Sequence, residues 1–220
     1  MSEKSKASEK SVATPGPGRP KDPAKRAAIL QAAQSLFLHS GYEGTSMDAI
    51  AAEAGVSKLT VYSHFTDKET LYAAAIRVVC EAQLPDLYFG EQPQGSIGQT
   101  LERIGNAFCV LINSSESLAL HRLLVGMAGQ DVRLAQLFYE EGPQRVCDGM
   151  VHILQQACER GELCIEQPQE AARQFFTLLK GDHHFRLLIG CDQAMADAER
   201  QQHVAGVVTL FLRLYRQHDG

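Results

Sequence analysis

The residues whose types and spacing most clearly suggest a chemical role lie between positions 57 and 68. Lys58 and Thr60 fall near the start of a short predicted helix and can hydrogen-bond to base edges or phosphates. Leu59 between them can offer an apolar contact to a thymine methyl group. Three further polar residues follow at the far end, where they would suit phosphates: Tyr62, His64 and Lys68. The pattern therefore predicts a surface that reads double-stranded DNA.

Two short helices must hold that surface in place. Thr45 or Ser46 can cap a helix that runs to Ala54, and both can present a hydroxyl or backbone N–H to a phosphate. Gly55 allows the positive φ of a tight turn, and Ser57 can cap the next helix, which ends near Phe65. The apolar positions that would fix the crossing of the two helices are Ile50, Ala51, Ala54, Val56 and Val61. This order and spacing are typical of a helix-turn-helix.

Charge is unevenly distributed along the chain. Residues 1–80 hold 10 Lys and Arg against 8 Asp and Glu, whereas the whole chain has a net charge of −5. A basic N-terminal part on an acidic chain suggests that only this part meets an anion. We expect Arg19, Lys21, Lys25 and Arg26 to form a flexible basic arm that reaches the DNA backbone or minor groove.

The stretch from about Ala27 to Leu71 resembles the DNA-binding domain of the TetR/AcrR family of bacterial regulators. The matching pieces include Thr45-Ser46-Met47, Ala54-Gly55-Val56-Ser57 and Val61-Tyr62-Ser63-His64-Phe65. The resemblance implies a homodimer that represses transcription until a small-molecule effector binds. It also implies DNA contacts at Thr45, Ser46, Lys58, Leu59, Thr60, Tyr62, His64 and Lys68. Relatives often have Gly at the position of Leu59, so the operator sequence does not follow from the resemblance.

The fold class predicted is all-α. Residues 1–18 are expected to be a disordered tail, 19–66 a three-helix DNA-binding head, and 67–218 a larger helical domain for ligand binding and dimerisation. A fourth helix from Asp67 would link the two domains. Pro143 and Pro168 are both predicted to occupy the first position of a helix. The C-terminal part resembles the AefR-like branch of the family, on cues such as Glu141-Gly142-Pro143 and Ala157 to Leu163.

Two sets of apolar residues are candidates for roles beyond core packing. Phe108, Met127, Met150 and Phe175 lie on apolar helix faces, where plain core packing competes with the lining of a ligand pocket. The last helix carries a second set on roughly one face: Val204, Val208, Phe211, Leu212 and Tyr215. These residues either complete the monomer core or contact a partner, and the family resemblance favours a dimer interface.

Other function classes find little support. No nucleophile–base pairing, phosphate-binding loop or metal-ligand spacing suggests an enzyme or a cofactor. No apolar run reaches bilayer length, and the first residues do not form a signal peptide, so we expect a cytoplasmic protein, associated with the nucleoid when bound to DNA. One alternative keeps the DNA-binding head but replaces the small ligand with a protein partner or thiol oxidation at Cys109, Cys147 or Cys158. Another is a family member that only binds proteins.

Overall fold

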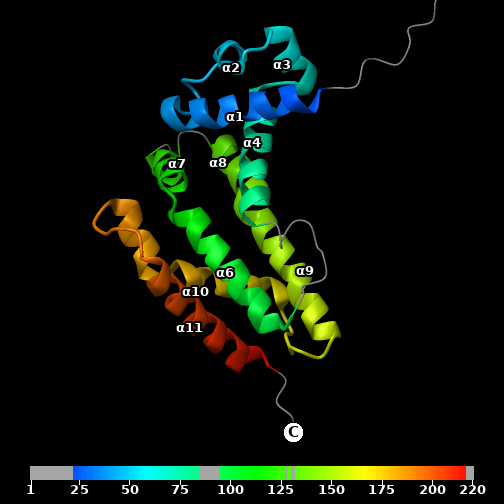
Figure 1. The fold of residues 1–220 in the computed structure, drawn as a ribbon, viewed down its shortest axis with the longest axis vertical. Coiled ribbons are helices and arrows are strands. Elements are labelled where there is room, and N and C mark those ends of the chain that lie inside the picture. The colour runs from blue at the N-terminus through cyan, green and yellow to red at the C-terminus, as the bar shows by residue number, and fades with distance from the viewer. Residues whose placement is uncertain (1–21, 85–94, 127, 130–131, 217–220) are drawn as a thin grey trace, which may run out of the picture.

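The computed structural model describes residues 22–84, 95–126, 128–129 and 132–216, and all of its regular structure there is helical (Figure 1). The predicted all-α class is confirmed. The expected tail 1–18, together with Arg19, Lys21 and Met127, lies outside the described residues. The helices in chain order are α1 Pro23–Ser40, α2 Met47–Glu53, α3 Lys58–His64, α4 Lys68–Gln83, α6 Ile97–Asn113, α7 Ser115–Gly126, α8 Val132–Tyr139, the π-helical turn η1 Glu140–Gln144, α9 Arg145–Glu159, α10 Pro168–Ile189 and α11 Asp197–Tyr215.

The first three helices form the head at one end of the molecule, crossing one another above the longer helices of the body (Figure 1). Local sequence explains where these helices begin. The Asp22 carboxylate accepts a hydrogen bond from Ala24 N at 3.0 Å, and Pro23 occupies the first turn of α1 as predicted. Ser46 caps α2 in the same way, because its Oγ accepts from Ala49 N at 3.1 Å.

Helix α4 joins the head to the body. Its Tyr72 ring packs edge-on against Phe37 of α1 and Tyr42 of the following turn, with ring centroids 5.1 and 5.3 Å apart. Leu71 on the same helix is fully buried in the head. The rest of α4 continues into the body, where it packs against α6, α8 and η1. One hydrophobic core therefore runs from the head into the body.

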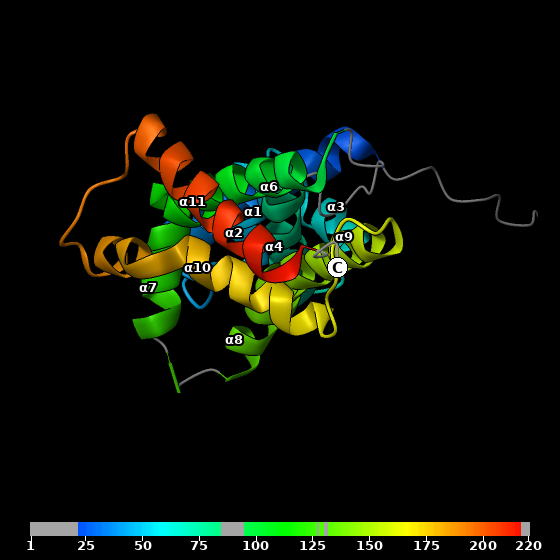
Figure 2. The same cartoon turned by 90° about the horizontal axis from the view of Figure 1, so that it is seen from below.

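The body is a bundle in which α6 packs on α10 and α11, and α9 packs on α10 (Figures 1 and 2). Phe175 of α10 and Phe211 of α11 are both buried, with their ring centroids 5.2 Å apart. Gly105 of α6 allows the close approach, because a Cβ there would lie 2.7 Å from Val204 Cγ1. Pro168 begins α10 as predicted.

Two backbone features were not predicted. Pro143 does not start a helix: it lies inside η1, which leads α8 directly into α9, so that expectation was wrong. The wider π-helical turn moves the carbonyl of residue i−4 away from the proline ring, which would clash with it in an α-helix. The second feature is a break within α10 at Gly181, whose φ is +50°.

No single helix in the described part of the chain is long and apolar enough to cross a membrane. Helices α6 and α7 pass that test of length and composition only as a pair, and they are bent by 61° where they meet.

The crowding around Gly105 gives a stability prediction. Gly105→Val should lower the free energy of unfolding by about 2 kcal/mol or more, because the added methyl groups overlap Val204 and Leu179 in a packed core. Glu102→Val, at an exposed position of the same helix, should cost only a few tenths of a kcal/mol through helix propensity. Chemical denaturation of both variants at one protein concentration measures the difference. Equal stabilities would contradict the packing described for α6.

Candidate nucleic-acid interface and ligand cavity

The turn between α2 and α3 sets the direction of α3. Gly55 has a φ of +65°, a conformation that favours glycine, and no atom would crowd a Cβ there, so backbone conformation alone explains the residue. Val56 N donates to Ala51 O at 3.0 Å, which closes the turn. Ser57 then caps α3 by accepting from Thr60 N at 3.2 Å. Buried Ile50 and Val61 hold the two helices together.

The outer face of α3 is exposed over its whole length. Leu59 is 80% exposed and Tyr62 is 44% exposed, which are high values for large apolar and aromatic side chains. Lys58 and Ser63 are exposed on the same helix, and Thr60 is half-buried with its hydroxyl 2.8 Å from Ser57 Oγ. An exposed leucine and tyrosine flanked by hydrogen-bonding groups fit the edge of a base pair and the adjacent phosphate.

Lys58 does not extend freely from this face. Its Nζ lies 2.8 Å from Asp48 Oδ1 of α2, and the hydrogen bond and charge of Asp48 raise the pKa of the lysine. Both side chains are exposed, so the pair contributes little to stability. Its consequence is positional: it holds the ammonium of Lys58 at the junction of α2 and α3.

Thr45 and Lys68 are turned inward, which corrects the prediction that both side chains face a phosphate. The Thr45 side chain is buried, and its Oγ1 donates to Gly41 O at 2.7 Å and Leu36 O at 3.1 Å. Lys68 Nζ donates to Tyr42 O at 2.8 Å and Thr45 O at 3.2 Å, and lies over the Tyr42 ring. Both residues stabilise the turn after α1. His64 is half-buried beside Phe65, whereas Ser46 is exposed.

Two of the four basic residues that were expected to form a flexible arm lie in a helix instead. Lys25 and Arg26 belong to the first turns of α1 rather than to an arm. The guanidinium of Arg26 lies 5.4 Å from the centre of the Phe65 ring, at the end of α3. This contact places the basic start of α1 next to the exposed face of α3, where the exposed Lys25 adds a second positive charge.

Comparisons with known proteins agree with this geometry. Residues 99–217 match the family described as "AefR-like transcriptional repressor, C-terminal domain", and residues 29–75 match "Bacterial regulatory proteins, tetR family". The chain belongs to the TetR family of transcriptional regulators. This is a family of DNA-binding regulators rather than enzymes. The HTH-type transcriptional regulator YdeS of Bacillus subtilis (strain 168) is 27% identical over 178 residues, 80% of this chain and 84% of YdeS.

Solved structures of TetR-family proteins share the whole architecture. A regulator from Mesorhizobium loti MAFF303099 is 28% identical with a TM-score of 0.72, over 89% of this chain and all of that chain. The "Flavonoid-responsive Regulator FrrA" is 30% identical with a TM-score of 0.69, over 88% of this chain and 98% of its own. The head and the helical body are therefore both similar to those of known regulators.

A cavity of about 610 Å³ lies between the head and the body of this TetR-family chain. Its walls come from α1, α4, α6, α7, α8, η1, α9 and α10. Most of the lining is apolar, and five aromatic rings contribute to it: Phe37, Tyr72, Phe108, Phe138 and Phe176. Gln34 of α1 is among the polar residues of the wall, and its amide also donates to Ala75 O of α4 at 3.1 Å. Because α1 and α4 form part of the wall, an occupant would touch both domains.

Of the residues predicted to line a ligand pocket, Phe108 does so. Met150 and Phe175 do not, because both are completely buried in the core of the body. The neighbouring Phe176 lines the cavity instead, with its ring 4.5 Å from that of Phe108. Apolar spacing along a helix identifies its buried face but does not separate the core side from the cavity side. The sequence analysis did not identify His121 and Lys180 as cavity residues. The only sign of that role in the sequence is that each is a polar residue in an otherwise apolar helical stretch.

The residues predicted to form a dimer interface also fall into two groups, one buried in the monomer core and one partly exposed. Val204, Val208 and Phe211 are at most 2% exposed within one chain, so they complete the monomer core and cannot form the partner-facing side of α11. Leu212 and Tyr215 are partly exposed, and the Tyr215 hydroxyl donates to Gln174 Oε1 at 2.8 Å. The exposed apolar residues of the last two helices are Leu178, Phe185, Ile189, Leu210 and Leu214.

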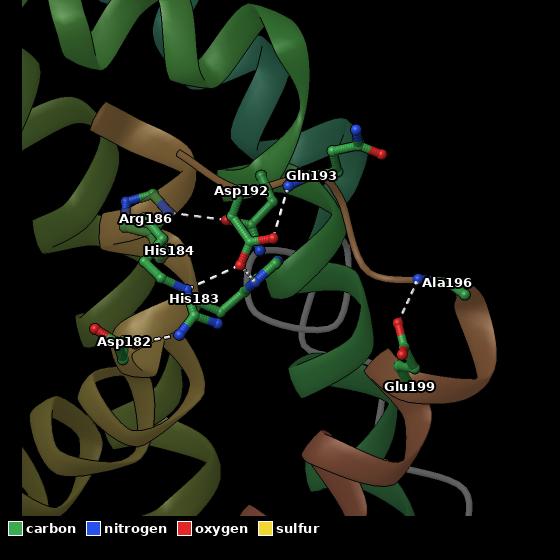
Figure 3. Close-up of polar contacts among 9 residues, drawn as sticks. Asp182, His183, His184, Arg186, Asp192, Gln193, Ala196 and Glu199 are labelled. Atoms are coloured by element: carbon green, nitrogen blue, oxygen red, sulfur yellow. Dashed lines mark hydrogen bonds and ion pairs between the residues drawn. The ribbon is translucent and has the colours of Figure 1, made fainter. Parts of the chain in front are cut away.

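The connection between α10 and α11 is held by a polar network (Figure 3). Arg186 donates from Nε to Asp192 Oδ2 at 2.9 Å and from Nη1 to Asp182 Oδ2 at 2.6 Å. His183 Nδ1 lies 3.2 Å from the same oxygen of Asp192, and Asp192 Oδ1 accepts from Gln193 N. Across the whole described part of the chain, no group of three or more His, Cys, Asp or Glu side chains could hold a metal ion.

His121 is the cavity residue with the most perturbed electrostatics. Its ring packs edge-on against Phe138 and His184, with centroid separations of 5.7 Å in both cases. Burial, followed by the charges of His184 and Lys180, lowers the pKa of His121 to about 4. Burial, followed by the charges of Lys180 and His183, lowers the pKa of His184, whose Nδ1 lies 2.8 Å from Asn113 Oδ1. Both imidazoles are therefore neutral at pH 7.

The lowered pKa of His121 predicts a pH dependence of stability. The unfolded imidazole takes up its proton near pH 6.5, whereas the folded one does so only near pH 4. Stability from this group is therefore complete above pH 6.5 and is lost as the pH falls towards 4. Between pH 7 and 4.5, His121→Phe should lose about 2 kcal/mol less unfolding free energy than the wild type. The unfolding free energies of both proteins can be measured by urea denaturation across that pH range. If they change equally with pH, the result would contradict the burial of His121.

Proposed function

We propose that this protein is a repressor that binds operator DNA as a homodimer and is released when a small, largely apolar molecule occupies the cavity. The observation that carries the proposal is the exposed face of α3, because a leucine and a tyrosine are left in solvent between hydrogen-bonding groups. The cavity directly below α1 supports the second part, since its occupant would contact the head as well as the body.

In the proposed complex, α3 enters the major groove with its N-terminal half towards the bases. Lys58 and Thr60 would hydrogen-bond to base edges or phosphates, and Leu59 would contact a thymine methyl group. Phosphate contacts would come from the residues around them: Ser46, Tyr62, His64, Lys25, and the preceding Arg19 and Lys21. Thr45 and Lys68 would act indirectly by holding the turn after α1 in place.

The exposed apolar side chains of α10 and α11 support dimerisation. These two helices lie side by side on the underside of the molecule (Figure 2). Phe185 and Ile189 of α10 and Leu214 of α11 are each more than half exposed, and a dimer interface on this side of the body would cover large apolar side chains of this kind. Joining two copies through it would give two heads, which must present their α3 helices about 34 Å apart to enter successive major grooves.

Release of DNA would follow from a population shift. A ligand lowers operator affinity only if it binds better to an arrangement of the heads that does not fit DNA. The cavity is suited to this role, because Gln34 of α1 and Ala75 of α4 line it and are hydrogen-bonded to each other. The name of the similar protein FrrA, "Flavonoid-responsive Regulator", supports a small-molecule input for this architecture.

Control by thiol oxidation is the weaker alternative. Burial raises the pKa of Cys109 to about 11 and also raises the pKa of Cys147, so both thiols stay protonated at neutral pH. A protonated thiol is a poor nucleophile and reacts slowly with oxidants. Cys158 is half-buried and packs against the hydrophobic core. None of the three matches the exposed, electropositive setting of a redox sensor.

The DNA-binding face gives the main test of this proposal. Lys58→Ala combined with Thr60→Ala should weaken binding to DNA from the protein's own upstream region by about 30-fold or more, because two lost base contacts at about 1–3 kcal/mol each cost at least about 2 kcal/mol together. If Lys58 also neutralises a phosphate, the slope of the logarithm of DNA affinity against the logarithm of salt concentration should become shallower by about one, because one fewer counterion is released. Fluorescence anisotropy over a range of salt concentrations measures both effects.

A matched control removes the same kinds of side chain from the body. Arg173→Ala combined with Thr177→Ala, at exposed positions of α10, should leave operator affinity unchanged. The proposal fails if the α3 variant binds as tightly as this control, or if the wild type binds its upstream DNA no better than random DNA.

A further inference from the structure

The cavity contains one permanent positive charge that its surroundings do not neutralise. Lys180 lines the wall from α10, and it is the only lysine in the sequence after Lys68. No ion pair joins it to a carboxylate in the part of the chain that the structure describes. The carboxylate on the wall, Glu116, accepts from the hydroxyl of its neighbour Ser115 at 3.0 Å instead.

Two neutral imidazoles lie within the field of this charge. The charge of Lys180 lowers the pKa of both His121 and His184, which keeps the two rings unprotonated at neutral pH. Among the described residues that line the cavity, Lys180 is the only lysine or arginine. His121 lines the cavity, and a neutral imidazole carries one N–H donor that an oxygen of a bound molecule can accept.

The aromatic residues of the remaining wall indicate the kind of molecule that would fit the cavity. Phe108 and Phe176 pack against each other at 4.5 Å, and Phe138 packs edge-on against His121. Such rings favour flat, ring-containing molecules through offset or edge contacts. The volume of about 610 Å³ is in the usual range for a small-molecule site.

We infer that the cavity binds an organic acid: an apolar, ring-containing molecule whose carboxylate or phenolate pairs with Lys180 Nζ and accepts a hydrogen bond from His121. This inference rests on the proposed function in one respect, since it takes the cavity to be the effector site. Hydrogen bonds between an ammonium and a carboxylate are about twice as strong as neutral ones, so the charge should dominate the choice between ligands of equal shape.

Two compounds of the same shape test the inference: biphenyl-4-carboxylate and biphenyl-4-carboxamide. Isothermal titration calorimetry at pH 7.5 on the full chain, without DNA, should give about tenfold tighter binding for the acid, the size expected for one charge-assisted hydrogen bond at a partly exposed site. Lys180→Met, which keeps an unbranched side chain one atom shorter and removes the charge, should abolish that preference while leaving the affinity for the amide unchanged. Lys180→Arg should retain the preference.

Arg173→Met supplies the control, because Arg173 is an exposed cation seven residues earlier on the same helix and does not line the cavity. It should leave both affinities unchanged. The inference is overturned if the amide binds as tightly as the acid, if Lys180→Met keeps the preference, or if neither compound binds at millimolar concentration.

Operator affinity measured separately distinguishes this inference from the proposed function. If the acid binds through Lys180 but operator affinity is unchanged in its presence, the ligand class holds and the release mechanism fails. If Lys180→Met binds operator normally and shows no loss of acid preference, the ligand class fails and DNA binding stands.

Discussion

The structure depends on the packing of α4 against the head. Helices α2 and α3 have seven residues each, which is too short for either to be stable without tertiary contacts. Their support comes from α1 and from two residues of α4, Leu71 and Tyr72, which complete the core of the head. Lys68 adds a polar link, since it donates to two carbonyl groups of the turn after α1. The orientation of the exposed face of α3, which we propose binds DNA, is thus fixed by a helix that also belongs to the body.

This shared helix makes a connection between ligand and DNA physically direct. The aromatic contact of Phe37 with Tyr72 lies at the junction of α1 and α4, and both residues also line the cavity. A molecule bound there would touch the same side chains that hold the head in position. Because packed cores adopt discrete arrangements rather than deforming continuously, a small change at this junction can select a different orientation of the head.

The sequence was most informative where structure is local. Gly55, Ser57 and Ser46 set the turn and the two caps, and each acts on residues within four positions of itself. The exposed face of α3, which we propose binds DNA, could therefore be located before the fold was known. The confirmed all-α class follows from the same kind of short-range periodicity, which the helices of the body also show.

Features that depend on long-range packing could not be predicted in this way. Thr45 and Lys68 look like phosphate ligands in the sequence, but their partners are carbonyl groups brought near by the fold. Val204 and Met150 have the apolar spacing of an interface or a pocket, yet neighbouring helices bury them completely. The cavity is assembled from helices of both domains, so no single segment of sequence carries its pattern.

In the proposed mechanism, filling the cavity changes the affinity for DNA. Val79 of α4 lines the cavity, and Val79→Phe would occupy part of it without any ligand. Val125→Phe makes the same change at a site 65% exposed and outside the cavity. Operator affinity by fluorescence anisotropy should fall by at least about fivefold for Val79→Phe, a typical coupling between two sites, with unchanged thermal stability. If Val79→Phe is stable and binds operator as tightly as Val125→Phe and the wild type, the cavity does not control the head.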